Sequence, residues 1–181
     1  GRVEARATGG SADGTAAYVL RKQRMSTTDD FKMQVDWHHS GQADESALWF
    51  GINTGDWNNL IDFGPEQENG ASFSADADTQ GVSVYHQALT RSITEGTLYI
   101  WYESAEDTVH LSLNGYGNEP DPATGEWVIQ GVVKGSWQAG AVTAYLMGTS
   151  ENAALAPGEA YFDNFQMIEG TVGTPPTRQL S

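Results

Sequence analysis

Apolar and polar residues alternate one by one along much of this chain, and this alternation limits the fold more than any other feature. In residues 31–37 every odd position is apolar and every even position is polar. In residues 97–103 the aromatic residues Tyr99 and Trp101 fall on the side opposite the other large apolar side chains, and residues 108–114 alternate as residues 31–37 do. A period of two is typical of β-strands, whereas the 3.6-residue period of an amphipathic helix is nearly absent. The pattern predicts an all-β protein.

Further strand candidates follow at short intervals, separated by residues that favour turns. The strands are predicted at residues 17–22, 47–53, 59–63, 82–87, 127–133, 141–147 and 159–168. Gly64-Pro65 and Asn114-Gly115 are two of the predicted turns, and the polar stretches 69–80 and 115–125 are predicted to be loops. About ten short strands at this spacing favour an antiparallel sandwich or barrel.

The chain of 181 residues has a length suited to one domain, which we place at residues 1–170. Residues 171–181 are rich in Thr and Pro and have the composition of a linker, so we expect them to lead to an additional module. The chain begins with Gly1 and not Met, which suggests a processed form or an excised segment. No apolar run approaches the ~18 residues of a membrane span, so we expect no membrane insertion.

Acidic residues outnumber basic ones by 24 to 9, which gives a formal net charge of −15. Such a surface repels phosphate backbones, which argues against nucleic acid and anionic membranes as partners. A neutral ligand, a cation or a basic protein is more compatible with this charge. The chain has no Cys, which excludes disulfides, thiolate metal sites and Cys nucleophiles.

Three stretches together resemble the concanavalin A-like lectin/glucanase superfamily in its laminin-G-like, jelly-roll form. They are DDFKMQVDWHH followed by ALWFGIN, then LYIWYESAEDTVHLSLNG, and the closing EAYFDNFQMIEG. The resemblance spans residues 17–170 and rests on the order and spacing of the stretches. It implies an antiparallel two-sheet β-sandwich, carbohydrate binding as the commonest activity, and a structural calcium ion. We expect an extracellular or cell-surface location.

Aromatic residues that point away from the core are candidates for a sugar site, because sugar rings stack on Trp and Tyr while amides and carboxylates bind the hydroxyl groups. The alternative is that these Trp side chains fill the space between the sheets. The candidate ligand-binding residues are Trp49, Asn53, Trp57, Asn59, Tyr85, Tyr99 and Trp101.

Two pairs of acidic residues are candidates for calcium. Asp76 and Asp78 occupy alternate positions, as at the start of a calcium loop, but no later Glu follows, so a plain acidic loop is the alternative. The resemblance suggests Asp163 as a calcium ligand, with Glu4 as its partner, against an Asp that only accepts backbone hydrogen bonds. The adjacent histidines at positions 38 and 39 are predicted to face the surface or a loop.

The hydrolases of this superfamily carry Glu-x-Asp-x-x-Glu or Glu-x-Asp-x-Glu on one strand, and neither string occurs here. The nearest approximation, Asp62-x-Gly64-x-Glu66-x-Glu68, is interrupted by Gly64-Pro65, so we interpret it as a solvated turn. We therefore assign no catalytic residue.

The sequence favours a non-catalytic, lectin-like carbohydrate-binding module. The first alternative is a structural adhesion, surface-layer or fibre subunit that assembles into homo-oligomers. The second is a glycoside hydrolase or polysaccharide lyase whose carboxylates come from separate strands.

Overall fold

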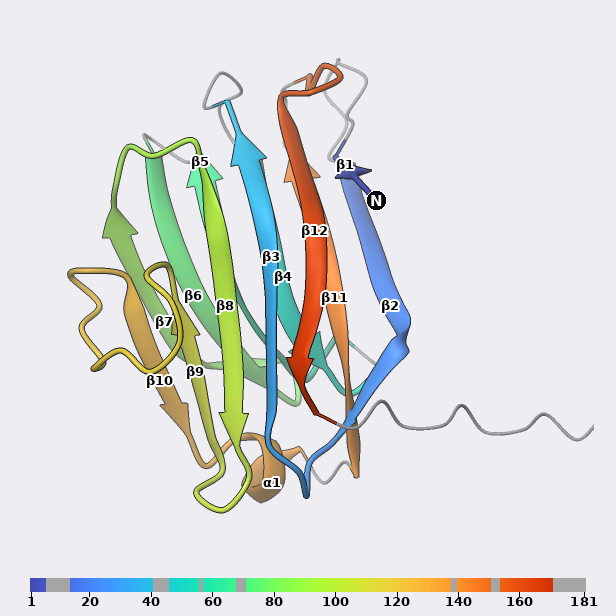
Figure 1. Cartoon of the computed structure of the whole chain (residues 1–181), viewed down its shortest axis with the longest axis vertical. Coiled ribbons are helices and arrows are strands. Elements are labelled where there is room, and N and C mark those ends of the chain that lie inside the picture. The colour runs from blue at the N-terminus through green and yellow to red at the C-terminus, as the bar shows by residue number, and fades with distance from the viewer. Residues whose placement is uncertain are drawn as a thin grey trace, which may run out of the picture.

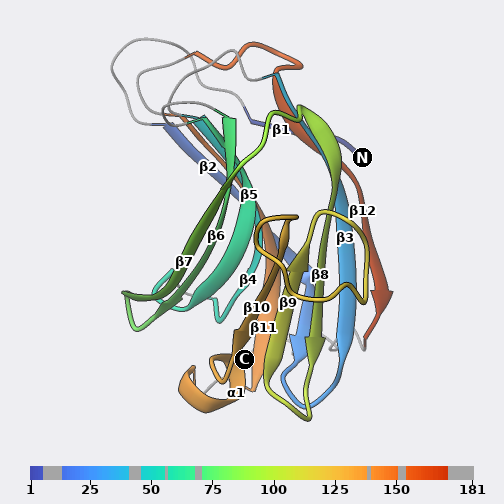
Figure 2. The ribbon, with the colours of Figure 1, turned by 90° about the vertical axis from the view of Figure 1, so that its left-hand side faces the viewer.

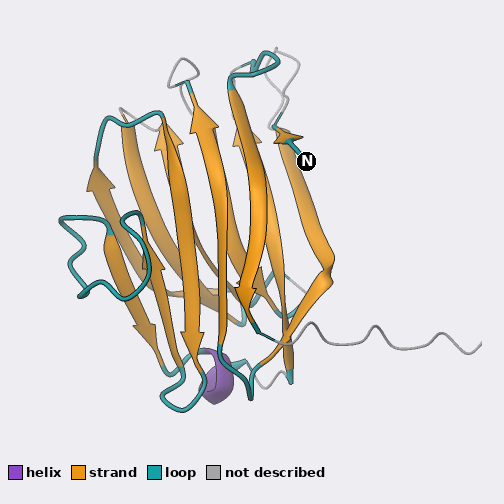
Figure 3. Ribbon diagram, viewed as in Figure 1, coloured by secondary structure: helices purple, strands orange, loops and turns teal. Residues whose placement is uncertain are grey.

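Two antiparallel β-sheets packed face to face make up the domain (Figures 1 and 2). The computed structural model describes residues 1–5, 14–40, 46–55, 57–67, 71–137, 140–150 and 154–170. Strands dominate these residues, with one short helix, as Figure 3 shows. Within the described ranges, no helix is long and apolar enough to cross a membrane. The predicted antiparallel β-sandwich is confirmed.

Within the described residues, each sheet contains six strands. Sheet I has the spatial order β1 (Val3–Glu4), β12 (Ala160–Glu169), β3 (Phe31–His39), β8 (Glu95–Glu103), β9 (Thr108–Ser112) and β10 (Glu126–Gln130). Sheet II has the order β2 (Gly14–Ser26), β11 (Ala141–Ser150), β4 (Ser46–Asn53), β5 (Leu60–Gln67), β6 (Ala71–Thr79) and β7 (Val82–Thr90). The helix α1 (Val133–Ser136) follows β10.

The core lies between the sheets and follows the alternation of the sequence. In β3 buried and partly buried residues alternate along the whole strand, and Met33 and Val35 are completely buried. Phe50 on β4 and Phe63 on β5 face them from sheet II. Each such side chain contributes about 2 kcal/mol through the removal of apolar surface from water. The opposite face of each strand is left for other contacts.

All the predicted strands are present, but the predicted loop at residues 69–80 is wrong, because β6 occupies most of it. The inward positions of β6 are Phe73, Ala75 and Ala77, and polar residues stand between them. The period of two is therefore present, but it is hard to recognise in the sequence because Ala is only slightly more hydrophobic than the polar residues beside it. β1 was also not predicted, since two residues are too few to show a period.

The predicted turn at Gly64-Pro65 is wrong as well, because β5 runs through both residues. Pro65 is paired with Phe73 on β6, whereas Gly64 and Pro65 have no paired residue in the ladder to β4. A proline has no N–H to donate, so it is tolerated in this inner strand where one ladder is interrupted.

The predicted loop at residues 115–125 connects β9 to β10, and Gly115 has a positive φ of 108°, as an Asn-Gly turn requires. The strand predicted at residues 127–133 ends earlier, at Gln130, and the chain continues into α1. The linker predicted at residues 171–181 lies outside the described residues.

Candidate functional site

Side chains on five neighbouring strands of sheet II line up at one level on its outer face. They form what we call the cross-strand row: Tyr145, Gly51, Asp62, Asp76 and His86, on β11, β4, β5, β6 and β7. Four spacings of ~4.8 Å give the row a length of about 19 Å. On β4, β5, β6 and β11, the two sequence neighbours of each row member belong to the core. Because successive side chains of a strand point to opposite faces, the row members point outward.

Gly51 allows the first part of the row to form. A Cβ atom at this position would lie 2.9 Å from Cζ of Tyr145 and 2.5 Å from Cβ of Asp62. The Tyr145 ring passes over the glycine, and its hydroxyl donates a hydrogen bond to Oδ2 of Asp62. The absent side chain on β4 thus lets residues two strands apart meet.

Asp62 is a buried acid that keeps its proton at neutral pH. Its exposed fraction is 4%, and burial raises the pKa of its carboxyl to about 8. The hydrogen bond from Tyr145 opposes this pKa rise, and the negative charges of Asp76 and Asp78 add to it. Burial likewise raises the pKa of the Tyr145 hydroxyl well above its usual range. Tyr145 and Asp62 therefore form an uncharged pair.

The other end of the row is more exposed and carries charge. Nδ1 of His86 lies 2.5 Å from Oδ1 of Asp76, and the side chains are 62% and 26% exposed. The hydrogen bond to Asp76 raises the pKa of His86. Burial raises the pKa of Asp76, and this effect outweighs the opposing effect of His86. This pair offers both a donor and an acceptor to a ligand.

Two tryptophans lie beside the row. Trp57 is 45% exposed, and its ring meets the Tyr145 ring edge-on with centroids 5.0 Å apart. Trp49 is partly exposed, two positions along β4 from Gly51 and therefore on the same outer face. The Cα atom of Trp49 lies 3.4 Å from the position that a Cβ atom on Gly64 of the neighbouring strand β5 would occupy. An aromatic surface is thus combined with polar groups on one sheet face.

The two predicted asparagines serve the turn that carries Trp57. Asn53 is only 2% exposed, and its Oδ1 accepts a hydrogen bond of 3.0 Å from the N–H of Gly55. Asn59 donates to Oγ1 of Thr54 and accepts a bond from the N–H of Gln80. These contacts place both side chains in the framework of the turn.

Tyr99 and Trp101 lie on the outer face of sheet I and not with Trp49 and Trp57. The Trp101 ring stacks on His110 at 4.6 Å between centroids, and Tyr116 meets it edge-on at 5.7 Å. Trp101 is therefore only 5% exposed, so it has little ring surface for a sugar. Tyr116, which was not singled out from the sequence, attaches the loop after β9 to the sheet through Tyr99 and Trp101.

Tyr85 points from β7 toward the space between the sheets, opposite to its neighbour His86. It packs against the core, and its hydroxyl donates to Oε1 of Gln87 at 3.0 Å. The seven predicted ligand-binding residues are thus divided among sheet II with its turn, the outer face of sheet I, and one edge of the sandwich.

The four predicted metal ligands belong to two different sheets. Glu4 forms an ion pair of 3.2 Å with Arg2, and Asp163 accepts a 2.8 Å hydrogen bond from the N–H of Asn164. Asp76 and Asp78 lie on β6 in sheet II. Among the residues that the structure describes, no group of three or more His, Cys, Asp or Glu side chains could hold a metal ion. The calcium ion stays a prediction.

The adjacent histidines are predicted to face the surface or a loop, and the structure excludes the surface for His39. It is 2% exposed, and its Nε2 lies 2.9 Å from Oγ of Ser46. Burial is the main cause that lowers the pKa of His39 to about 4. His38 points the other way and stacks on Tyr161 at 5.0 Å, since neighbouring side chains of a strand face opposite sides.

Solved structures share this fold at low sequence identity. A functionally unknown protein from Saccharomyces cerevisiae has a TM-score of 0.59 and 12% identity over 83% of this chain and 73% of its own. CG-16, a homodimeric agglutinin from chicken liver, has a TM-score of 0.53 and 9% identity over 84% and 99%. A GH43B protein of Bacteroides ovatus has a TM-score of 0.50 and 14% identity over 77% of this chain and 27% of its own.

These likenesses show the fold alone, an antiparallel β-sandwich of two sheets. Comparisons with models of protein families and with curated proteins find no match.

Proposed function

We propose that this chain is a non-catalytic carbohydrate-binding domain of a secreted or cell-surface protein, and that the outer face of sheet II binds the glycan. One observation carries the proposal: the exposed Trp57 lies against Tyr145 at one end of a row whose other end is the hydrogen-bonded pair Asp76 and His86. An aromatic ring and accessible polar groups on one surface are what a sugar requires.

The two parts of this face have different tasks in the proposal. The rings of Trp57 and Trp49 stack on the apolar faces of sugar rings. Asp76 and His86 exchange hydrogen bonds with hydroxyl groups further along the row, whose length of about 19 Å suits a short, extended oligosaccharide. An open sheet face holds such a ligand weakly, so we expect a Kd of about millimolar to micromolar.

The agglutinin with the same sandwich supports a glycan over other ligands, although fold alone does not decide function. The net charge of −15 further favours neutral glycans over sulfated or uronic acid polymers.

The test is a glycan array followed by titration calorimetry on the best neutral oligosaccharide. Trp57→Ala should weaken binding about tenfold or more, and Trp49→Ala should weaken it as well, because each removes a stacking surface. Tyr99→Ala, on the opposite outer face, is the control and should leave the Kd unchanged. An arm with a chelator tests the predicted calcium ion. A folded protein that binds no glycan, or equal binding by all three variants, contradicts the proposal.

A glycoside hydrolase is the second candidate, because Asp62 and Asp76 are directly opposed on neighbouring strands. Opposed side chains on a sheet have Cβ atoms ~5 Å apart, close to the carboxylate separation of retaining glycosidases. The burial of Asp62 beneath Tyr145 speaks against contact with a substrate. Release of reducing ends that stops in Asp76→Asn would favour the hydrolase, whereas binding without release favours the lectin.

A further inference from the structure

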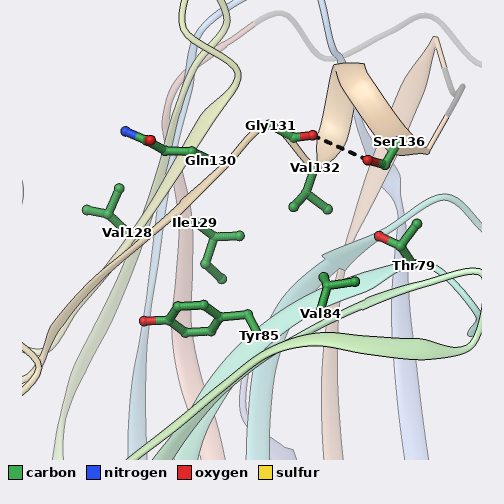
Figure 4. A pocket seen from close by; sticks show the side chains of 9 residues that line it. All are labelled: Thr79, Val84, Tyr85, Val128, Ile129, Gln130, Gly131, Val132 and Ser136. Carbon is green, nitrogen blue, oxygen red and sulfur yellow. Dashed lines mark hydrogen bonds between the residues drawn. The ribbon is translucent and has the colours of Figure 1, made fainter.

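A cavity of about 310 Å³ opens at the edge of the sandwich where β7 and β10 are the last described strands of their sheets. We call it the edge cavity. In Figure 4, Ile129 of β10 and Val132 of the following turn point toward Val84 and Tyr85 of β7, and Thr79 lies beside Val84. It is separate from the cross-strand row, since Tyr85 and His86 point to opposite faces of sheet II.

A β-bulge in β7 builds one wall of this cavity. The register pairs Ala77 with Tyr85 but Asp78 with Ser83, so Val84 is an additional residue in the strand. A bulge turns an extra side chain toward the face of its neighbour, which explains why Val84 and Tyr85 both face the cavity. Without it, Val84 would point to the outer face of sheet II.

The lining is uncharged in a strongly acidic protein. It consists of Thr79, Val84, Tyr85, Val128, Ile129, Gln130, Gly131, Val132 and Ser136, none of which is acidic or basic. The strand β7 itself has no Lys, Arg, Asp or Glu. A charged ligand would leave water here without gaining a partner of opposite charge, which disfavours its binding.

The hydroxyl groups of the lining already have partners within the protein. Tyr85 donates to Gln87, Oγ1 of Thr79 accepts from Nε1 of Trp137 at 3.2 Å, and Ser136 donates to the carbonyl oxygen of Gly131. A sugar, which needs many hydrogen bonds, therefore finds little to bind at this place. Apart from the Gln130 amide, the cavity offers mainly contact with Val84, Ile129 and Val132.

We propose that the edge cavity binds a small, uncharged, mainly apolar molecule of one or two rings. The volume supports this size, because an apolar cavity of ~150 Å³ can hold benzene and larger ligand pockets begin at ~300 Å³. Val84, which lines the cavity, is 52% exposed, so the cavity is open to a ligand from solvent. This binding is independent of the glycan site.

Indole is a suitable probe, with indole-3-carboxylate as its charged counterpart. The measurement is methyl NMR of the whole chain during titration, with Val84, Ile129 and Val132 as reporters. Indole should move these signals with a Kd of about 1 mM or lower, and the carboxylate should bind at least tenfold more weakly. Val84→Trp should abolish indole binding by filling the cavity. Val82→Trp adds the same bulk to the same strand outside the lining and should bind as the unchanged chain does.

Three results would overturn the proposal. The reporter signals do not move with indole, or Val84→Trp binds indole as well as Val82→Trp does. A concentration-dependent dimer that dissociates in Val84→Trp would instead assign the edge cavity to a second copy of the chain.

Discussion

At the scale of single residues, burial decides which ionisable side chains of this protein carry a charge at neutral pH. Asp62 and His39 are both nearly inaccessible, and burial shifts their pKa values in opposite directions, to about 8 and about 4. Both side chains are therefore neutral at pH 7, although the sequence shows them as an ordinary acid and an ordinary base. Each shift links the stability of the fold to pH.

The buried Asp62 predicts that the protein becomes less stable as pH rises from 6.5 to 8. Its pKa is about 8 when folded and near 3.8 when unfolded, so the folded state holds the extra proton in this range. The stabilising contribution is complete below pH 3.8 and is lost as pH passes 8. Between pH 6.5 and 8 the unfolding free energy should fall by on the order of 1 to 2 kcal/mol from this group.

Urea unfolding of the wild-type chain and of Asp62→Asn at several pH values measures this effect. The variant cannot titrate at position 62, so its unfolding free energy should depend less on pH across this range. His39 contributes little here, because the folded and unfolded states bind different numbers of protons at His39 only from about pH 4 to 6.5. Two curves that run parallel from pH 6.5 to 8 would show that Asp62 is ionised in the folded protein.

The aromatic residues show that local alternation fixes the side of a strand but not its neighbours in the sheet. Alternation placed Trp49 and Trp101 on the outer sides of their strands, and both positions have that orientation. It did not reveal that the two strands belong to different sheets, or that Trp101 is covered by His110 and Tyr116. Which aromatic rings share a surface depends on strand pairing, which has no local signal.

At the scale of secondary-structure elements, β5 is the strand in which close packing overrides local preference. Gly64 and Pro65 together are typical of a turn, yet they lie in an inner strand between β4 and β6. Close approach of β4 explains the glycine, since a Cβ atom at Gly64 would overlap the carbonyl oxygen of Leu48. No residue with a side chain fits there without moving the backbone of β4.

Gly64→Ala should therefore destabilise the fold by about 3 kcal/mol, or prevent folding, because the added methyl group overlaps a backbone atom. The free energy of unfolding from urea titration measures the loss. Gly140→Ala is the matched control, because a Cβ atom at that position would meet no described atom within 4 Å. Its effect should be below about 0.5 kcal/mol. Equal effects of the two changes would disprove the close approach of β4 and β5.

The element β6 shows how small inward residues conceal a strand. Ala75 and Ala77 are fully buried between Phe73 and the end of the strand, and Asp76 stands between them on the outer face. The sequence suggested a polar loop with a calcium-like spacing. As a strand, the same residues place Asp76 opposite Asp62 and His86, which creates the candidate site.

At the scale of the whole molecule, the charge of −15 acts on the folded state as a whole. Packing 24 acidic side chains into a folded domain brings like charges closer than in the unfolded chain. The sandwich must therefore hold together against a repulsion that salt can screen.

We predict that sodium chloride stabilises the protein. Raising its concentration from about 10 mM to about 0.1 M shortens the screening length from ~30 Å to ~10 Å. The unfolding free energy in urea should rise by on the order of 1 kcal/mol. Urea is used because it is uncharged, and chloride is preferred to sulfate, which also stabilises proteins by exclusion from their surface. A constant or falling unfolding free energy would mean that attractive ion pairs outweigh the repulsion.

The class of fold, most of the strands and the buried side of strands such as β3 follow from the sequence alone. These properties are local: alternation and turn residues act within a few positions of the chain. The cross-strand row, in contrast, depends on tertiary structure. Its members are as distant in the sequence as Gly51 and Tyr145, and they meet through the register of four strand pairs. The same is true of the edge cavity, which exists because a bulge in β7 faces β10 across the sandwich.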